Sequence, residues 1–219
     1  MRTDARKLFQ VPAGLEEKYV GPLMCAGVTT FEPIRKLLGG SLDGKGKTIG
    51  VVGIGGLGHL ALQFANKTGA TAVAFSRGTG KTEFAKQLGA AYLVDTTDDE
   101  AMKKAAATLD QLIVTISGGA FDTDKYLPLL KPEGNLHFCG VPAEPITLNV
   151  QTILFNRNSV SANPVGGETD TKLMLDFCAE NGVRPIIEEF LHSKAHEAID
   201  KVRNGSIRFR AVLKNDLIE

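Results

Sequence analysis

Short apolar runs alternate with segments of helical spacing along most of the chain. Residues 47–52 read KTIGVV and predict a buried strand, and residues 57–69 place Leu57, Leu60 and Phe64 on one helical face before Gly69 ends the helix. The same alternation predicts strands at 71–75, 91–95, 111–117, 134–140 and 159–163, and helices at 80–89, 98–109 and 122–130. Six strands separated by helices or short crossovers predict an α/β fold with a doubly wound parallel six-stranded sheet.

A glycine-rich turn follows the first predicted strand directly. Gly53, Gly55 and Gly58 form the pattern G-x-G-x-x-G at the start of the next helix. In this context the first glycine permits a tight turn, the second lets the backbone approach a pyrophosphate, and the third lets the helix pack close to the sheet. We therefore predict a Rossmann-type dinucleotide site, and a turn that only packs the helix on the strand is the alternative. The predicted contacts are Gly53, Ile54, Gly55, Gly56, Leu57 and Gly58.

The end of the second predicted strand indicates which dinucleotide binds. NAD-binding proteins of this fold place a carboxylate about 20 residues after the glycines, where it accepts hydrogen bonds from the ribose. Here Ser76 and Arg77 occupy that place, and Lys81 follows a turn later. A hydroxyl and two cations suit the 2′-phosphate of NADP, which a carboxylate would repel. We predict NADP as the cofactor, and a solvated surface loop is the alternative.

Charge and composition argue against a nucleic acid partner and against a membrane span. Lys and Arg number 25 and Asp and Glu number 25, and no basic stripe is visible, so we expect no nucleic acid partner. No apolar run approaches the roughly 18 residues of a membrane span, and the start MRTDARKLFQVPAG lacks the apolar core of a secretory signal, so a cytoplasmic protein is expected. Cys25, Cys139 and Cys178 stand far apart and predict reduced thiols.

Two segments carry a family resemblance that runs nearly end to end. GPLMCAGVTTFEPI at 21–34 and VVGIGGLGHLALQFA at 51–65 resemble the zinc-containing medium-chain alcohol dehydrogenases, in particular the cinnamyl alcohol dehydrogenase branch. The resemblance implies an NADP-dependent oxidoreductase that interconverts a primary alcohol and an aldehyde by hydride transfer. It also implies that Ser76, Arg77 and Lys81 hold the 2′-phosphate.

The resemblance assigns further contacts to the cofactor. Thr29 would touch the nicotinamide, Arg210 would reach the pyrophosphate, and Cys139, Gly140 and Val141 would line the nicotinamide half of the cleft. At the sixth strand the family usually reads Gly-Ser-x-x-Gly, whereas this chain reads Ala-Asn-Pro-Val-Gly at 162–166. Asn163 is therefore the candidate contact there, at a position that departs from the family.

The larger departure concerns zinc. Relatives begin with a catalytic domain that carries GxCHSD and GHE segments and four clustered cysteines, and none of these is present in the sequence. Of the family's catalytic zinc ligands only Cys25 remains, while a catalytic zinc normally needs three protein ligands. We expect a truncated chain that holds no zinc and is inactive alone. His192 and His196 are interpreted as flanking an exposed helix, and His59 and His137 as packing residues.

The expected organisation has three parts. Residues 1–29 form a linker and an entering helix, residues 30–166 the NADP-binding Rossmann domain, and residues 167–219 a C-terminal remnant of the catalytic domain. A non-catalytic NADP-binding or regulatory module and a zinc-free quinone reductase remain alternatives, the latter disfavoured by the cysteine in PLMCAGVTT. Relatives join through the edge of the cofactor sheet, and the strand SVSAN at 159–163 offers such an edge, so a homodimer is expected.

Overall fold

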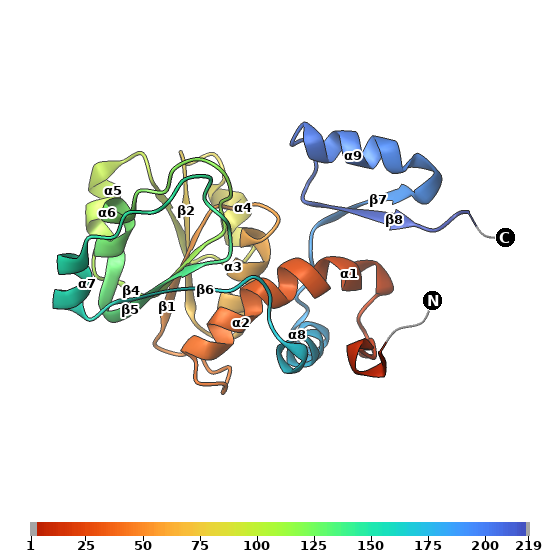
Figure 1. Ribbon diagram of the computed structural model, residues 1–219, viewed down its shortest axis with the longest axis horizontal. Helices are drawn as coiled ribbons and strands as arrows, with labels where there is room; N and C mark the ends of the chain where they lie inside the picture. Colours follow the sequence, from red (N-terminus) through yellow and green to blue (C-terminus); the bar gives the residue numbers. More distant parts are fainter. Residues whose placement is uncertain (1–3, 218–219) are drawn as a thin grey trace.

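The protein is built around one parallel sheet of six strands, and the computed structural model describes residues 4–217 (Figure 1). The strands are β1 Thr48–Val52, β2 Thr71–Ser76, β3 Tyr92–Asp95, β4 Leu109–Val114, β5 Leu130–Phe138 and β6 Ser159–Ala162. They lie in the order β3-β2-β1-β4-β5-β6, and all neighbouring pairs are parallel. This is the doubly wound order with its switch point between β1 and β4, so the predicted fold class is confirmed.

Helices cover both faces of this sheet. On one face lie α2 Val28–Leu37, α3 Gly58–Lys67, α4 Thr82–Gln87 and α8 Glu168–Asn181. On the other lie α5 Asp99–Lys104, α6 Thr123–Tyr126, the 3-10 turn η3 Leu127–Leu129 and α7 Val150–Asn156. The side chains of β2 alternate between the two cores, with Ala72 and Ala74 in one and Val73 and Phe75 in the other. Within residues 4–217, no helix combines the length and apolar character that crossing a membrane requires.

Three aromatic rings from three helices hold the first core together. Phe31 of α2 lies 5.3 Å from Phe64 of α3 and 5.6 Å from Phe177 of α8, measured between ring centroids. All three rings are buried. Thus α8 packs in the core of the six-stranded sheet although it follows the boundary predicted at residue 166. The boundaries at residues 29 and 166 stay predictions.

The chain reaches the sheet through a nearly continuous helix. A 3-10 turn η1 Ala5–Lys7 comes first, followed by α1 Glu17–Pro22, a π-helical turn η2 Leu23–Gly27 and α2. Cys25 lies in the π-helical turn.

The last part of the chain forms a second, smaller sheet. β7 Ile187–Leu191 and β8 Arg210–Lys214 pair in parallel, and η4 His192–Lys194 and α9 Ala195–Arg203 connect them. Figure 1 shows this unit, in blue, beside the six-stranded sheet. His192 and His196 are exposed where α9 begins, as the sequence predicted.

Several predicted boundaries are wrong between β3 and β5. The helix predicted at 98–109 ends at Lys104, because the N–H groups of Ala107 and Thr108 donate to the carbonyls of Pro128 and Leu129 at 2.9 and 3.0 Å. β4 already begins at residue 109 and ends at 114, three residues before the predicted end. The helix predicted at 122–130 gives way to β5 at residue 130, four residues before the predicted start of that strand. Contacts between segments far apart in sequence thus override the local periodicity.

Candidate dinucleotide site

The glycine turn after β1 has the geometry that its spacing predicts. Gly53 has a φ of +91°, which residues with a side chain rarely adopt. A Cβ at Gly58 would lie 1.9 Å from the carbonyl oxygen of Gly53, so only glycine lets α3 start this close to β1. A Cβ at Gly55, by contrast, would meet nothing within 4 Å. The turn is therefore tight at Gly53, closely packed at Gly58 and open at Gly55.

The amino end of α3 is available to an anion. Leu57 is the N-cap and makes no side-chain capping bond. The N–H groups of His59 and Leu60 already donate to the carbonyl oxygens of Gly55 and Leu57 at 3.1 and 3.0 Å, so the N–H groups that precede His59 are the ones left for an anion. Arg210, at the start of β8, brings positive charge to the same turn, where its Nε and a terminal guanidinium nitrogen donate to the Gly56 carbonyl oxygen at 3.3 and 3.0 Å. The structure thus brings Arg210 to the place where the resemblance implied a pyrophosphate contact.

His59 links the glycine turn to the C-terminal part of the chain. The backbone N–H of Ile186 donates to Nε2 at 3.0 Å, so the ring proton lies on Nδ1, which is 2.8 Å from the Gly55 carbonyl oxygen. Burial lowers the pKa of His59 to about 4, and the ring is neutral at pH 7. The interpretation of His59 as a packing residue is confirmed by its burial, and the structure adds these two hydrogen bonds.

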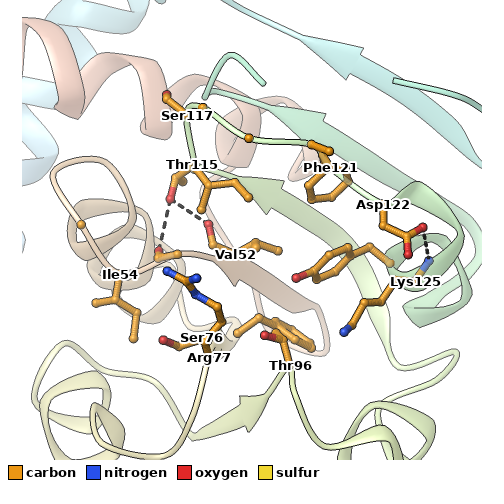
Figure 2. A pocket seen from close by; sticks show the side chains of 18 of the residues that line it. Val52, Ile54, Ser76, Arg77, Thr96, Thr115, Ser117, Phe121, Asp122 and Lys125 are labelled. Carbon is orange, nitrogen blue, oxygen red and sulfur yellow. Dashed lines mark hydrogen bonds between the residues drawn. The ribbon is translucent and has the colours of Figure 1, made fainter. Parts of the chain in front are cut away.

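The loop after β2 presents a hydroxyl and two cations to a pocket of about 680 Å³ (Figure 2). Ser76, Arg77 and Lys81 all line this pocket, and none of their side chains bonds to another residue within 4–217. Lys125 of α6 adds a third cation from the other side. Asp122, the one carboxylate among the described lining residues, accepts backbone N–H groups at the start of α6. This set of donors fits a dinucleotide that carries an additional phosphate.

Asp95 fixes the backbone of this loop from the neighbouring strand. It is the last residue of β3, and its Oδ1 accepts from the Gly78 N–H at 2.8 Å. The N–H and hydroxyl of Thr97 donate to the same oxygen at 2.8 and 2.7 Å. The bonds from Thr97 and Gly78 lower the pKa of Asp95, so the carboxylate stays ionised while it holds the loop.

The opposite wall of the pocket was missed by the sequence analysis. The Thr115 hydroxyl, just after β4, donates to the carbonyl oxygens of Val52 and Gly53 at 2.8 and 3.2 Å (Figure 2). Further along, Phe121 stacks on Tyr126 with ring centroids 4.8 Å apart. The sequence did not predict this wall, because it placed residues 115–117 inside a strand, whereas β4 ends at Val114. The strand order alone could have predicted this wall, since residues that follow β1 and β4 share the crevice at the switch point of the sheet.

A second group of predicted residues meets at the carboxyl ends of β5 and β6. The Cys139 thiol and the Asn163 side-chain N–H groups lie 3.4 and 3.3 Å from the carbonyl oxygen of Thr29. At Gly140, a Cβ would lie 2.1 Å from the carbonyl oxygen of Ile116, so the chain passes close to the segment after β4. The next residue, Val141, is 77% exposed. The structure therefore brings together the residues that the resemblance assigned to the nicotinamide half. Their contact with a cofactor stays a prediction.

Cys25 is the candidate zinc ligand that the resemblance left in this chain. Cys25 is exposed, and all three cysteines are free thiols, as the sequence predicted. A catalytic zinc needs three protein ligands, and among residues 4–217 no three His, Cys, Asp or Glu side chains group closely enough to hold a metal ion. The described residues thus offer Cys25 no companion ligands.

Comparison with known proteins identifies the family. The family model described as "Zinc-binding dehydrogenase" matches residues 56–180, more than half of the chain. The chain belongs to the zinc-binding dehydrogenase family. The resemblance to zinc-containing alcohol dehydrogenases, predicted from the segments around Cys25 and Gly53, is thereby confirmed.

Individual relatives in this family resemble nearly the whole chain. The aldehyde reductase AdhA of Synechocystis is 36% identical over 215 residues, which cover 98% of this chain and 62% of that protein. NADP-dependent alcohol dehydrogenase C 1 of Mycolicibacterium smegmatis is 35% identical over 210 residues, or 96% of this chain and 59% of the relative. The solved structure of a cinnamyl alcohol dehydrogenase from Sorghum bicolor matches with a TM-score of 0.86 at 36% identity, covering 96% of this chain and 60% of that chain. The chain thus spans about three fifths of the length of these zinc-binding dehydrogenases.

Replacement by alanine should have a large effect on stability at Gly58 and a small one at Gly55. Gly58→Ala forces a Cβ onto the Gly53 carbonyl oxygen and should lower the free energy of unfolding by about 1–3 kcal/mol or more. Gly55→Ala adds a methyl group in open space and should change that free energy by less than about 1 kcal/mol. Urea unfolding followed by circular dichroism measures both. Equal losses would show that the close approach of α3 to β1 is not what Gly58 provides.

The neutral His59 ring predicts a pH dependence of stability. Its pKa is 6.5 ordinarily and about 4 in the fold, so the unfolded chain binds the proton more readily. The stabilisation is complete above about pH 6.5 and is lost as the pH falls toward 4, by about 3 kcal/mol in total. His59→Gln cannot titrate, so its free energy of unfolding should fall less over this interval than that of the wild type. Parallel pH profiles for the two proteins would contradict the assignment.

Proposed function

We propose that the chain is the cofactor-binding part of an NADP-dependent oxidoreductase that interconverts a primary alcohol and an aldehyde. The observation that carries this proposal is the set of free side chains at the pocket, Ser76, Arg77 and Lys81, placed where the 2′-phosphate of NADP would lie. The names of the relatives support it, since one is called an aldehyde reductase and another an NADP-dependent alcohol dehydrogenase.

Each part of the site has a role in this proposal. The glycine turn from Gly53 to Gly58, the amino end of α3 and Arg210 hold the pyrophosphate. Thr29 and residues 139–141 receive the nicotinamide, which supplies the hydride for reduction of an aldehyde when NADPH is bound. The inactivity expected for the chain alone stays a prediction.

The proposal predicts that the chain binds NADP(H) more tightly than NAD(H). Strong charge-assisted hydrogen bonds contribute about 1.5–3 kcal/mol each, so Arg77→Gln and Lys81→Gln should each weaken NADPH binding at least about tenfold and leave NADH binding unchanged. Lys86→Gln is the matched control, because Lys86 is an exposed cation of α4 that pairs with Glu83 and lies outside the pocket. Titration calorimetry measures all four proteins with both cofactors. Wild type that binds NADH as tightly as NADPH would refute the proposed cofactor.

We further propose a homodimer through the β6 edge of the cofactor sheet. β6 is the last strand of the sheet, so its outer backbone groups have no partner strand within residues 4–217. Just before β6 in the chain, α7 packs against β5 and exposes Val150, Leu154 and Phe155 at 70%, 67% and 81% of their surfaces. An open strand edge and an exposed apolar helix are both features that a second copy would cover.

The oligomeric state tests this surface. Wild type should sediment as a dimer at tens of micromolar, and Leu154→Glu or Phe155→Glu should shift it to a monomer, because a buried unpaired carboxylate opposes association. Val202→Glu, on the exposed side of α9, changes a comparably exposed apolar residue and should leave the dimer intact. A monomeric wild type would contradict the proposed interface.

A further inference from the structure

A chain of hydrogen bonds crosses the last two strands of the sheet and ends at α2. Asn135 of β5 donates through Nδ2 to the Ser161 hydroxyl of β6 at 2.9 Å. His137, two residues along β5, has its Nδ1 2.8 Å from the same hydroxyl and its Nε2 2.8 Å from Oδ1 of Asn163. Asn163, just beyond β6, donates through Nδ2 to the carbonyl oxygen of Thr29 at 3.3 Å. The chain thus ties β5 and β6 to the first turn of α2.

The direction of these bonds is fixed by their last acceptor. The Thr29 carbonyl oxygen can only accept, so the amide of Asn163 must face it with Nδ2 and turn Oδ1 toward His137. His137 then donates from Nε2, and its Nδ1 accepts from the Ser161 hydroxyl. Burial lowers the pKa of His137, which favours this neutral ring. Oδ1 and one of the two N–H groups of the Asn163 side chain are therefore bonded to protein partners.

Thr29 is the residue that these contacts immobilise. Its carbonyl oxygen lies 3.3 Å from Nδ2 of Asn163 and 3.4 Å from the sulfur of Cys139, while its own hydroxyl donates to the carbonyl oxygen of Pro164 at 3.3 Å. Thr29 is 4% exposed, and its partners lie in the segments that directly follow β5 and β6.

We propose that His137 and Asn163 form a clamp that positions Thr29 for the nicotinamide end of NADP(H), with Asn163 acting as a positioning residue for Thr29. The inference rests on the proposed function and changes the role given to Asn163 from a cofactor contact to a residue that holds Thr29 in place. None of Thr29, His137, Cys139 and Asn163 lines the pocket beside Ser76 and Arg77. The clamp therefore belongs to one half of the dinucleotide site only.

Because the clamp lies away from the pocket beside Ser76 and Arg77, its loss should affect binding of the nicotinamide end alone. NADPH and adenosine 2′,5′-bisphosphate share the phosphate-bearing adenosine, but only NADPH carries a nicotinamide. His137→Phe removes the donor to Asn163, and Asn163→Asp keeps the size of the side chain while it removes the donor to Thr29. Each variant should weaken NADPH binding by about fivefold to tenfold, the effect of one unsatisfied hydrogen bond, and leave the bisphosphate within about twofold. His137→Gln, which restores an N–H donor near Nε2, should recover most of the NADPH affinity.

A matched control lies at the other end of β6. Asn158 is buried just before this strand and donates through Nδ2 to the Lys131 carbonyl oxygen at 2.8 Å, so Asn158→Asp makes the same change away from the clamp. It should weaken neither ligand's binding, and a thermal melt confirms that each variant is folded. Equal losses for both ligands, or no loss of NADPH binding in folded Asn163→Asp, would overturn the clamp. A wild type that binds neither ligand would instead overturn the proposed function, and the clamp with it.

Discussion

The close approach of α3 to β1 is the constraint on which the rest of the structure depends. The helix begins where Gly58 has no side chain, since a Cβ there would lie 1.9 Å from the Gly53 carbonyl oxygen. This approach buries Leu60 and Phe64 in the core between the helix and the sheet. It also leaves an uncapped helix end at the carboxyl edge of the sheet. Gly58 therefore matters both for the packing of the core and for the proposed pyrophosphate site.

The C-terminal part of the chain completes the turn. Ile186 donates its N–H to His59, and Arg210 donates to the carbonyl oxygen of Gly56. A Cβ at Gly56 would lie 3.0 Å from the guanidinium group, so this glycine, which the G-x-G-x-x-G pattern does not specify, lets Arg210 lie flat against the turn. The proposed pyrophosphate site is thus assembled from two segments that are more than 150 residues apart. Only Arg210 comes from the small sheet, while the turn and the helix start belong to the large one.

The parts that the sequence predicted well are those whose cause is local. The strand before Gly53, the turn and the helix after it follow from apolar periodicity and glycine spacing, and all lie where predicted within a residue or two. The failures have distant causes. Carbonyl groups of residues 128 and 129 end the helix of residues 99–104, and no periodicity near that helix shows this. Likewise, the sequence marks Asn163 as a departure from the family, but only the fold brings His137 to its side chain.

The two halves of the proposed site use different physical means. On the adenosine side, Arg77 and Lys81 are exposed and unpaired, and only the backbone of their loop is fixed, through the bond from Gly78 to Asp95. Attraction between a phosphate and a cation falls off slowly with distance, so it does not depend on one exact placement of these side chains. On the nicotinamide side, Thr29 is buried and held by directed bonds. A misplacement of about 1 Å costs a transfer reaction on the order of a hundredfold in rate, so rigidity is needed there and not at the phosphate.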